Sequence, residues 1–195
     1  MRPQAPLLAA LALALAVVCV ATPRVHAAAP RTPDEQRETL MGLLATVDIK
    51  LSRAALDTVG DDVSHQLVLI ADLPRVPTIV RMRAVAALAY YPSTLVRSYL
   101  VSRLHERSLI GTPLGTELRR QAVRSLGAGF GADAVDDVIE LLGDREPLIR
   151  EAVALALGDA GSPHALPTLE GWLGREPELF VRAAIDHAIS QLRGR

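Results

Sequence analysis

A column of arginines recurs along the chain at one place in a repeated pattern. Arg81, Arg119, Arg150 and Arg182 each follow an aliphatic residue and precede apolar residues three and seven positions further on. Guanidinium groups bind carboxylates and phosphates through a planar fork, so four of them on one surface would form an anion-binding ladder. Beside a buried face, the same groups would need partners within the fold. The sequence leaves both interpretations open and favours the structural one.

The other reactive residue types are scattered. The only cysteine, Cys19, lies in an apolar N-terminal segment, and no His-Glu-x-x-His or Gly-x-Ser-x-Gly motif occurs. The glycine-rich stretch 127–131 follows a predicted helix rather than a strand, which favours a turn over a phosphate-binding loop. We therefore predict no catalytic residue, no metal and no cofactor. Four histidines follow residue 27, and none is three or four positions from another: His65, His105, His164 and His187.

The arginine column belongs to a repeat of about thirty residues. A weaker copy has Ser52 in the arginine position, and the spacings from Ser52 onward are 29, 38, 31 and 32 residues. Each copy continues an apolar helical face, and a second amphipathic stretch precedes it. This period is typical of stacked helix pairs, so we predict an all-α fold, a short α-solenoid of about five pairs. The aligned copies are 51–60, 80–89, 118–127, 149–158 and 181–189, and the stretches before them are 37–47, 63–73, 95–104, 134–142 and 166–173.

Residues that typically start or end helices fall at the ends of these predicted helices. Thr32, Pro33 and Glu35 combine an N-cap, a proline at the first helical position and a capping box. Pro147 and Pro163 also stand at expected helix starts. Three glycines follow the last apolar position of their helices and are expected at C′: Gly60, Gly127 and Gly158.

The copy from Asp144 to Gly158 resembles the HEAT-like repeat, also called the PBS-lyase HEAT-like repeat. Members carry an aspartate about six residues before the arginine, and Asp144 with Arg150 fits this pattern. The resemblance covers 133–192 best. It implies that the column arginine bonds the turn aspartate and backbone carbonyls of adjoining repeats, so we expect Arg150 to pair with Asp144. The expected structural ladder is Arg81, Arg119, Asp144, Arg150, Glu176 and Arg182, although Arg75 and Pro113 stand at the acid position before Arg81 and Arg119.

In similar solenoids, positions one and five beyond the arginine lie toward the concave face, where partners bind. The 38-residue spacing adds the segment 105–117, which we predict as a loop bordering that face. An acidic partner with an apolar edge would suit this surface. An ordinary solvated face and a tolerated insertion are the alternatives. The predicted partner-binding residues are Arg120, Arg124, Glu151, His187, Leu109 and Ile110.

Residues 1–27 have the pattern of a signal peptide. Arg2 is followed by fourteen apolar residues over 7–20, and Val25-His26-Ala27 fits a cleavage site. The apolar run is short for a membrane span, which needs about 20 residues. We expect an exported, periplasmic or extracellular protein with a linker at 28–33 and the repeat domain at 34–195. The alternatives are an uncleaved membrane anchor and a lipoprotein at Cys19, which the bulky Val18 disfavours.

Charge narrows the function further. The chain has 21 basic and 22 acidic residues, and cleavage would remove Arg2 and Arg24, leaving 19 − 22 = −3. This balance disfavours nucleic acid as a partner. The leading hypothesis is a non-catalytic protein-binding or scaffold module of the bacterial cell envelope. The alternatives are an enzyme resembling the HEAT-like bilin lyases and an accessory subunit of a larger envelope complex.

Overall fold

The computed structural model describes residues 31–46 and 50–194, and over these residues it contains helices and turns but no strand. The predicted all-α fold is therefore confirmed. The predicted signal peptide at 1–27 lies outside the described residues. Within them, no helix combines the length and the apolar character needed to cross a membrane.

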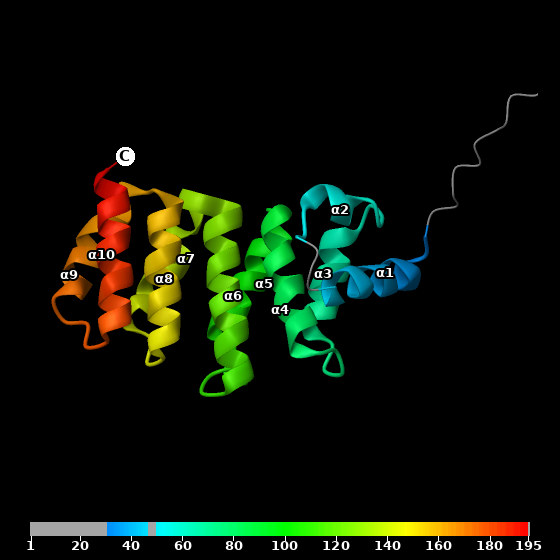
Figure 1. Ribbon diagram of the computed structural model, residues 1–195, viewed down its shortest axis with the longest axis horizontal. Coiled ribbons are helices and arrows are strands. Elements are labelled where there is room, and N and C mark those ends of the chain that lie inside the picture. Colours follow the sequence, from blue (N-terminus) through cyan, green and yellow to red (C-terminus); the bar gives the residue numbers. More distant parts are fainter. Residues whose placement is uncertain (1–30, 47–49, 195) are drawn as a thin grey trace, which may run out of the picture.

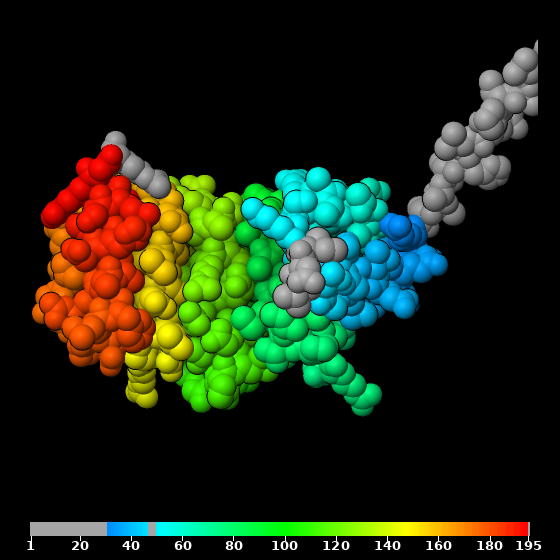
Figure 2. Space-filling model, viewed as in Figure 1, coloured from blue at the N-terminus to red at the C-terminus, as the bar shows by residue number. Residues whose placement is uncertain are grey.

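The helices form two layers along one axis (Figure 1). Neighbouring helices of the inner layer contact one another along the array, and each outer helix packs behind them. Figure 2 shows the successive repeats as parallel bands. The inner helices are α4 (Thr78–Ala87), α6 (Pro113–Phe130), α8 (Pro147–Ala160) and α10 (Leu179–Arg193); the outer ones are α3 (Val63–Asp72), α5 (Thr94–His105), α7 (Val135–Val138) and α9 (Leu166–Leu173). Short 3-10 turns are η1 (Leu88–Tyr90), η2 (Gly131–Ala134), η3 (Ile139–Gly143) and η4 (Pro163–Ala165).

The N-terminal end of the array departs from the expected regular pair. Helix α1 (Pro33–Ala45) lies across the end of the array in Figure 1 and packs against α3 and α4. The helix expected over 51–60 is only α2 (Arg53–Asp57), capped at one end by Ser52 and at the other by Thr58. Thr32 and Glu35 form the predicted capping box that starts α1. Over residues 31–46 and 50–194, the array thus consists of four helix pairs and a crosswise N-terminal cap, where about five regular pairs were predicted.

A continuous aliphatic core joins the two layers, and small residues let the inner helices approach closely. Gly127 and Gly158 are buried inside α6 and α8, which continue to Phe130 and Ala160, so their expected C′ role is wrong. A Cβ on Gly127 would lie 2.9 Å from the Cβ of Ala156 on the neighbouring helix. Tertiary contact therefore requires this glycine. Helix α8 ends instead at Gly161, whose φ of 69° is left-handed.

The segment predicted as a loop over 105–117 is partly helical. Helix α6 begins at Pro113, six residues before Arg119, whereas α8 begins three residues before Arg150. Thr112 caps α6 by accepting a hydrogen bond from the Gly115 amide at 3.0 Å. The extra residues of the long repeat therefore form a short loop, 106–112, and one additional helical turn.

Candidate functional site

Two arginines of the column are buried and bound to carboxylates. Arg119 is 4% exposed; its Nε donates to the carbonyl of Leu104 at 2.9 Å and its Nη2 to Asp144 Oδ2. Arg150 is 7% exposed and binds Glu176 through two bonds, 2.8 Å from Nε to Oε2 and 2.6 Å from Nη2 to Oε1. Such charge-assisted bonds compensate for the desolvation of both ions. These arginines therefore join one repeat to the next.

The acid of each turn serves the arginine of the preceding repeat. The Asp144 carboxylate accepts a hydrogen bond from Arg119. Arg150 does not bond this carboxylate and contacts Asp144 through its backbone carbonyl alone, at 2.9 Å. Glu176 likewise bonds Arg150, six positions before Arg182, and not Arg182 itself. The expected pairing of Asp144 with Arg150 is therefore wrong. The side chain of the arginine extends toward the turn that begins the next inner helix, so its partner comes from there.

The same carboxylates also hold the turns. Asp144 Oδ1 accepts from the Glu146 amide at 2.9 Å, and Glu176 Oε1 accepts from the Glu178 amide at 3.0 Å. Hydrogen bonds from Arg150 lower the pKa of Glu176, and Glu176 raises the pKa of Arg150. Each acid therefore links a helix start to the neighbouring repeat.

Arg81 and Arg182 have no carboxylate partner among the described residues. Arg81 Nε donates to the Ala71 carbonyl at 2.7 Å, as Arg119 does to Leu104. In the later turns, Asp144 and Glu176 each stand six residues before the next arginine of the column. In the turn that follows Arg81, this position is occupied by Pro113, which has no carboxylate. Arg182 is exposed on α10, the last described helix. The expected ladder thus has two filled positions, and Arg182 departs from it because no described turn lies beyond α10 to supply an acid.

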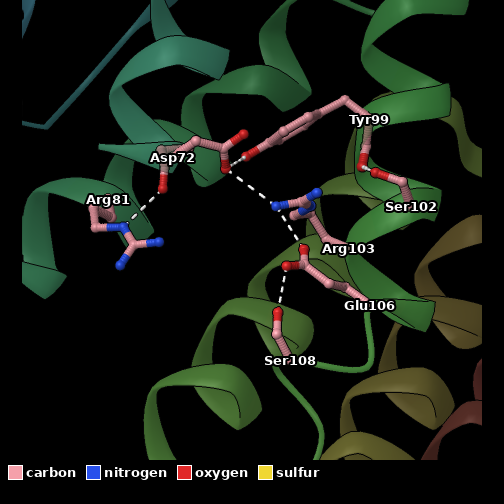
Figure 3. A network of polar contacts seen from close by, with 8 residues as sticks. Asp72, Arg81, Tyr99, Ser102, Arg103, Glu106 and Ser108 are labelled. Atoms are coloured by element: carbon pink, nitrogen blue, oxygen red, sulfur yellow. Dashed lines mark hydrogen bonds and ion pairs between the residues drawn. The ribbon is translucent and has the colours of Figure 1, made fainter. Parts of the chain in front are cut away.

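A polar network that the sequence did not predict connects α3 to α5 (Figure 3). Asp72 Oδ1 accepts from the Tyr99 hydroxyl at 2.8 Å and from Arg103 Nη1 at 3.2 Å, and Arg103 also pairs with Glu106 at 2.7 Å. The Arg103 guanidinium lies over the Tyr99 ring, and Ser108 donates to Glu106. Burial and the bond to Asp72 raise the pKa of Tyr99. Asp72 lies 27 residues before Tyr99, so no spacing pattern indicates this contact between the two helices. Tyr99, Arg103 and Glu106, by contrast, are four and three residues apart, a spacing that does indicate contacts along one side of a helix.

The predicted basic pair on the inner helices is not a pair of free cations. Arg120 is 16% exposed and lies 3.1 Å from Glu117 and 3.5 Å from Glu151. Arg124 and His187 are exposed, with no bond or ion pair described for either. The inner face therefore presents Arg124 and His187 as separate polar groups, while Arg120 and Glu151 neutralise each other.

Leu109 and Ile110 differ in exposure. Leu109 packs against the core, whereas Ile110 is 53% exposed. Ile110 borders a depression of ≈ 410 Å³ lined by Gly143, Asp144 and Arg145. Beside it, a second depression of ≈ 350 Å³ lies between the 111–113 segment and Leu148. The loop 106–112 thus faces the next turn across a hollow with one apolar wall.

Exposed arginines and exposed aspartates are concentrated at different edges of the array. We name the edge formed by turns 73–77, 106–112, 143–146 and 174–178 the arginine edge. Each of its turns has one exposed arginine, and the last of them also exposes Glu178; the opposite edge has exposed aspartates in its turns. The arginines are Arg75, Arg107, Arg145 and Arg175, of which Arg175 stacks on Trp172; the aspartates are Asp57, Asp61, Asp62, Asp133 and Asp159.

No group of three or more histidine, cysteine, aspartate or glutamate side chains lies close enough to hold a metal ion within the described part of the chain. The predicted lack of a metal, a cofactor and a catalytic centre remains a prediction.

Comparison with known proteins identifies the class of the array. Residues 116–190 match the family model of HEAT repeats, so this segment of the array consists of HEAT repeats. The match covers both filled arginine–carboxylate positions. HEAT repeat domains generally serve as protein-interaction modules. No curated protein matches the chain.

Proposed function

We propose that this chain is a non-catalytic protein-binding module of the bacterial cell envelope. The observation that carries the proposal is the HEAT repeat match over residues 116–190, in an array whose charges divide into two kinds. Arg119 and Arg150 are paired with carboxylates inside the fold, whereas exposed arginines line one edge without a described carboxylate partner. An extended repeat surface with free charge suits recognition of another protein.

The envelope location rests on the signal-peptide pattern of residues 1–27. A fusion of the full chain to a reporter that is active only after export tests it. Signal from the full chain, lost when residues 1–27 are deleted, supports export. Equal cytoplasmic signal from both fusions contradicts it. Mass spectrometry of the exported chain then distinguishes cleavage near Ala27 from retention as an anchor or lipidation at Cys19.

Binding is tested with the chain from Ala28 onward, immobilised and exposed to an envelope extract after mild crosslinking. One or two envelope proteins enriched over bare resin, and competed by free chain, support the proposal. Enrichment of nucleic acid in place of protein contradicts it. A coloured chromophore retained on purification also contradicts it and favours the lyase-like alternative. A fixed stoichiometry within a large assembly indicates the accessory-subunit alternative.

A further inference from the structure

The arginine ladder has one internal position at which the chain supplies no carboxylate. Arg81 follows the same geometry as Arg119, with Nε bound to the last carbonyls of the preceding outer helix. Arg119 then binds Asp144 through Nη2, but Arg81 meets Pro113 at the corresponding sequence position. Arg81 is half-buried, and within the described residues neither of its terminal nitrogens has a bond and neither is completely buried. Both atoms therefore retain some solvent-accessible surface.

The acids nearest to Arg81 are engaged elsewhere. Figure 3 shows Arg81 with a single dashed line, to a backbone oxygen, while Asp72 points to Tyr99 and Arg103. Glu106 is bound by Arg103 and Ser108. The guanidinium of Arg81 is thus left with its forked side open to an incoming anion.

Further cations and apolar side chains flank this position on the arginine edge. Arg75 lies in the turn that leads into α4, and Arg107 lies in the loop that follows Glu106; both are exposed and without a described partner. Ile79, two residues before Arg81, is 50% exposed, and Ile110 borders the depression described above. Positive charge and apolar surface therefore alternate along this edge.

We propose that Arg81 anchors a carboxylate of an acidic segment from a protein partner, which completes the ladder from outside. Arg75 and Arg107 bind further carboxylates of the same segment, and an apolar residue of it covers Ile110. The inference rests on the proposed protein-binding function and specifies its site and the chemistry of its partner.

The spacing of the repeats constrains that segment. Packed helices lie about 8–10 Å apart, and a chain in the polyproline II conformation advances about 3.1 Å per residue with three residues per turn. One repeat step therefore corresponds to about three residues of such a chain, after which a side chain returns to the same face. We expect acidic side chains at about every third position of the bound segment.

The filled positions favour a protein carboxylate over a membrane surface. Asp144 and Glu176 show that this arginine position accepts one carboxylate at close range. A forked bond of this kind discriminates by shape, whereas a lipid surface attracts any cation through its charge. Anionic vesicles therefore serve as the competing arm of the test.

The probe is a labelled synthetic peptide of about a dozen residues with glutamate at every third position and leucine near the middle. A matched peptide has glutamine in place of glutamate. Binding to the chain from Ala28 onward is measured by fluorescence anisotropy at two salt concentrations. Arg81→Ala, Arg81→Lys and the pair Arg75→Ala with Arg107→Ala are compared with Arg124→Ala. Arg124 is the exposed inner-face arginine that the sequence predicts to bind a partner, so the comparison distinguishes the arginine edge from the inner face.

We expect the glutamate peptide to bind and the glutamine peptide not to. Arg81→Ala weakens binding about tenfold, which corresponds to about 1.4 kcal/mol; Arg81→Lys retains charge without the fork and recovers only part of the loss. The Arg75/Arg107 pair weakens binding about as much, and Arg124→Ala has no effect. Circular dichroism verifies that each variant is folded. The side chains of Arg75 and Arg107 have no described internal bonds, so the pair tests the site even if Arg81→Ala unfolds.

Equal binding of both peptides, or equal losses from Arg124→Ala and Arg81→Ala, overturns the proposal. Binding to phosphatidylglycerol vesicles but not to the glutamate peptide assigns the edge to a membrane and also overturns it. An envelope protein that is captured equally by the wild type and by the Arg81 and Arg75/Arg107 variants refutes this site while the proposed function stands. No capture by the wild type refutes the proposed function itself.

Discussion

The two halves of the array treat the same arginine differently. In the C-terminal half, Arg119 and Arg150 are buried and bound to acids from the following turns. In the N-terminal half, Arg81 keeps the carbonyl bond but has no acid, and the polar network around Asp72 and Tyr99 joins the helices instead. The HEAT repeat match lies in the C-terminal half, from residue 116 to residue 190.

This difference separates two uses of one residue type. A buried guanidinium without a counter-charge would destabilise the fold, so the filled positions must be satisfied internally. An arginine whose terminal nitrogens keep solvent-accessible surface has no such requirement and remains available for a ligand. The residue in the following turn decides between these two uses. An aspartate or glutamate there pairs with the arginine, whereas a proline leaves the arginine without an acid.

The largest effect is expected at the buried pair of Arg150 and Glu176. Arg150→Ala leaves the Glu176 carboxylate, which is 4% exposed, without its partner and should lower the free energy of unfolding by about 3–5 kcal/mol. Arg81→Ala removes one bond to a carbonyl and should cost about 1 kcal/mol. Urea denaturation of the two variants measures both. Equal midpoints would remove the distinction between the halves.

The pH dependence of stability should arise at the same pair. Arg150 lowers the pKa of Glu176 in the folded state, so this carboxylate stabilises the fold above the unfolded-state pKa of about 4.3. That contribution is lost as the pH falls from there through the folded-state pKa. Glu176→Gln should therefore be less stable than wild type at neutral pH, with the difference shrinking in acid. A constant difference from pH 7 to pH 3 would contradict the assignment.

A smaller effect is expected in the N-terminal half, at the Tyr99 network. Tyr99→Phe removes the hydroxyl that donates to Asp72 at 2.8 Å and should cost about 1 kcal/mol. Arg103 still bonds Asp72, which limits the loss. Thermal unfolding followed by circular dichroism measures the change, with Ser102→Ala on the same helix as the control. A loss as large as that of Arg150→Ala would show that this network equals the filled ladder positions.

The smallest difference is expected between two neighbouring arginines of α6. Arg120 lies between Glu117 and Glu151, and Arg120→Ala should cost up to about 1 kcal/mol, more in low salt. Arg124 is exposed, and Arg124→Ala should change stability by less than about 0.5 kcal/mol. Urea midpoints at low and high salt provide the comparison. A larger loss at Arg124 would indicate an inter-repeat contact for that residue.

The period of the repeat and the residues that start its helices were sufficient to predict the fold class. The spacing of apolar residues places each stretch on a helical face, and Thr32 with Glu35 and the proline at Pro147 mark helix starts through local bonds. Such local bonds can be predicted because all their atoms lie within a few residues. The candidate ladder positions also followed from the aligned copies.

Only the tertiary structure decided which acid meets which arginine. Asp144 is six residues from Arg150 and 25 from Arg119, yet its carboxylate binds Arg119. The reason is that the Arg119 side chain extends to the turn before α8, whereas the Arg150 side chain binds Glu176 in the turn before α10. Gly127 likewise has the pattern of a helix terminus, but it lies inside α6. A glycine is needed there because Ala156 of α8 leaves no room for a Cβ. Both outcomes depend on contacts between helices, which a periodic pattern along one helix does not contain.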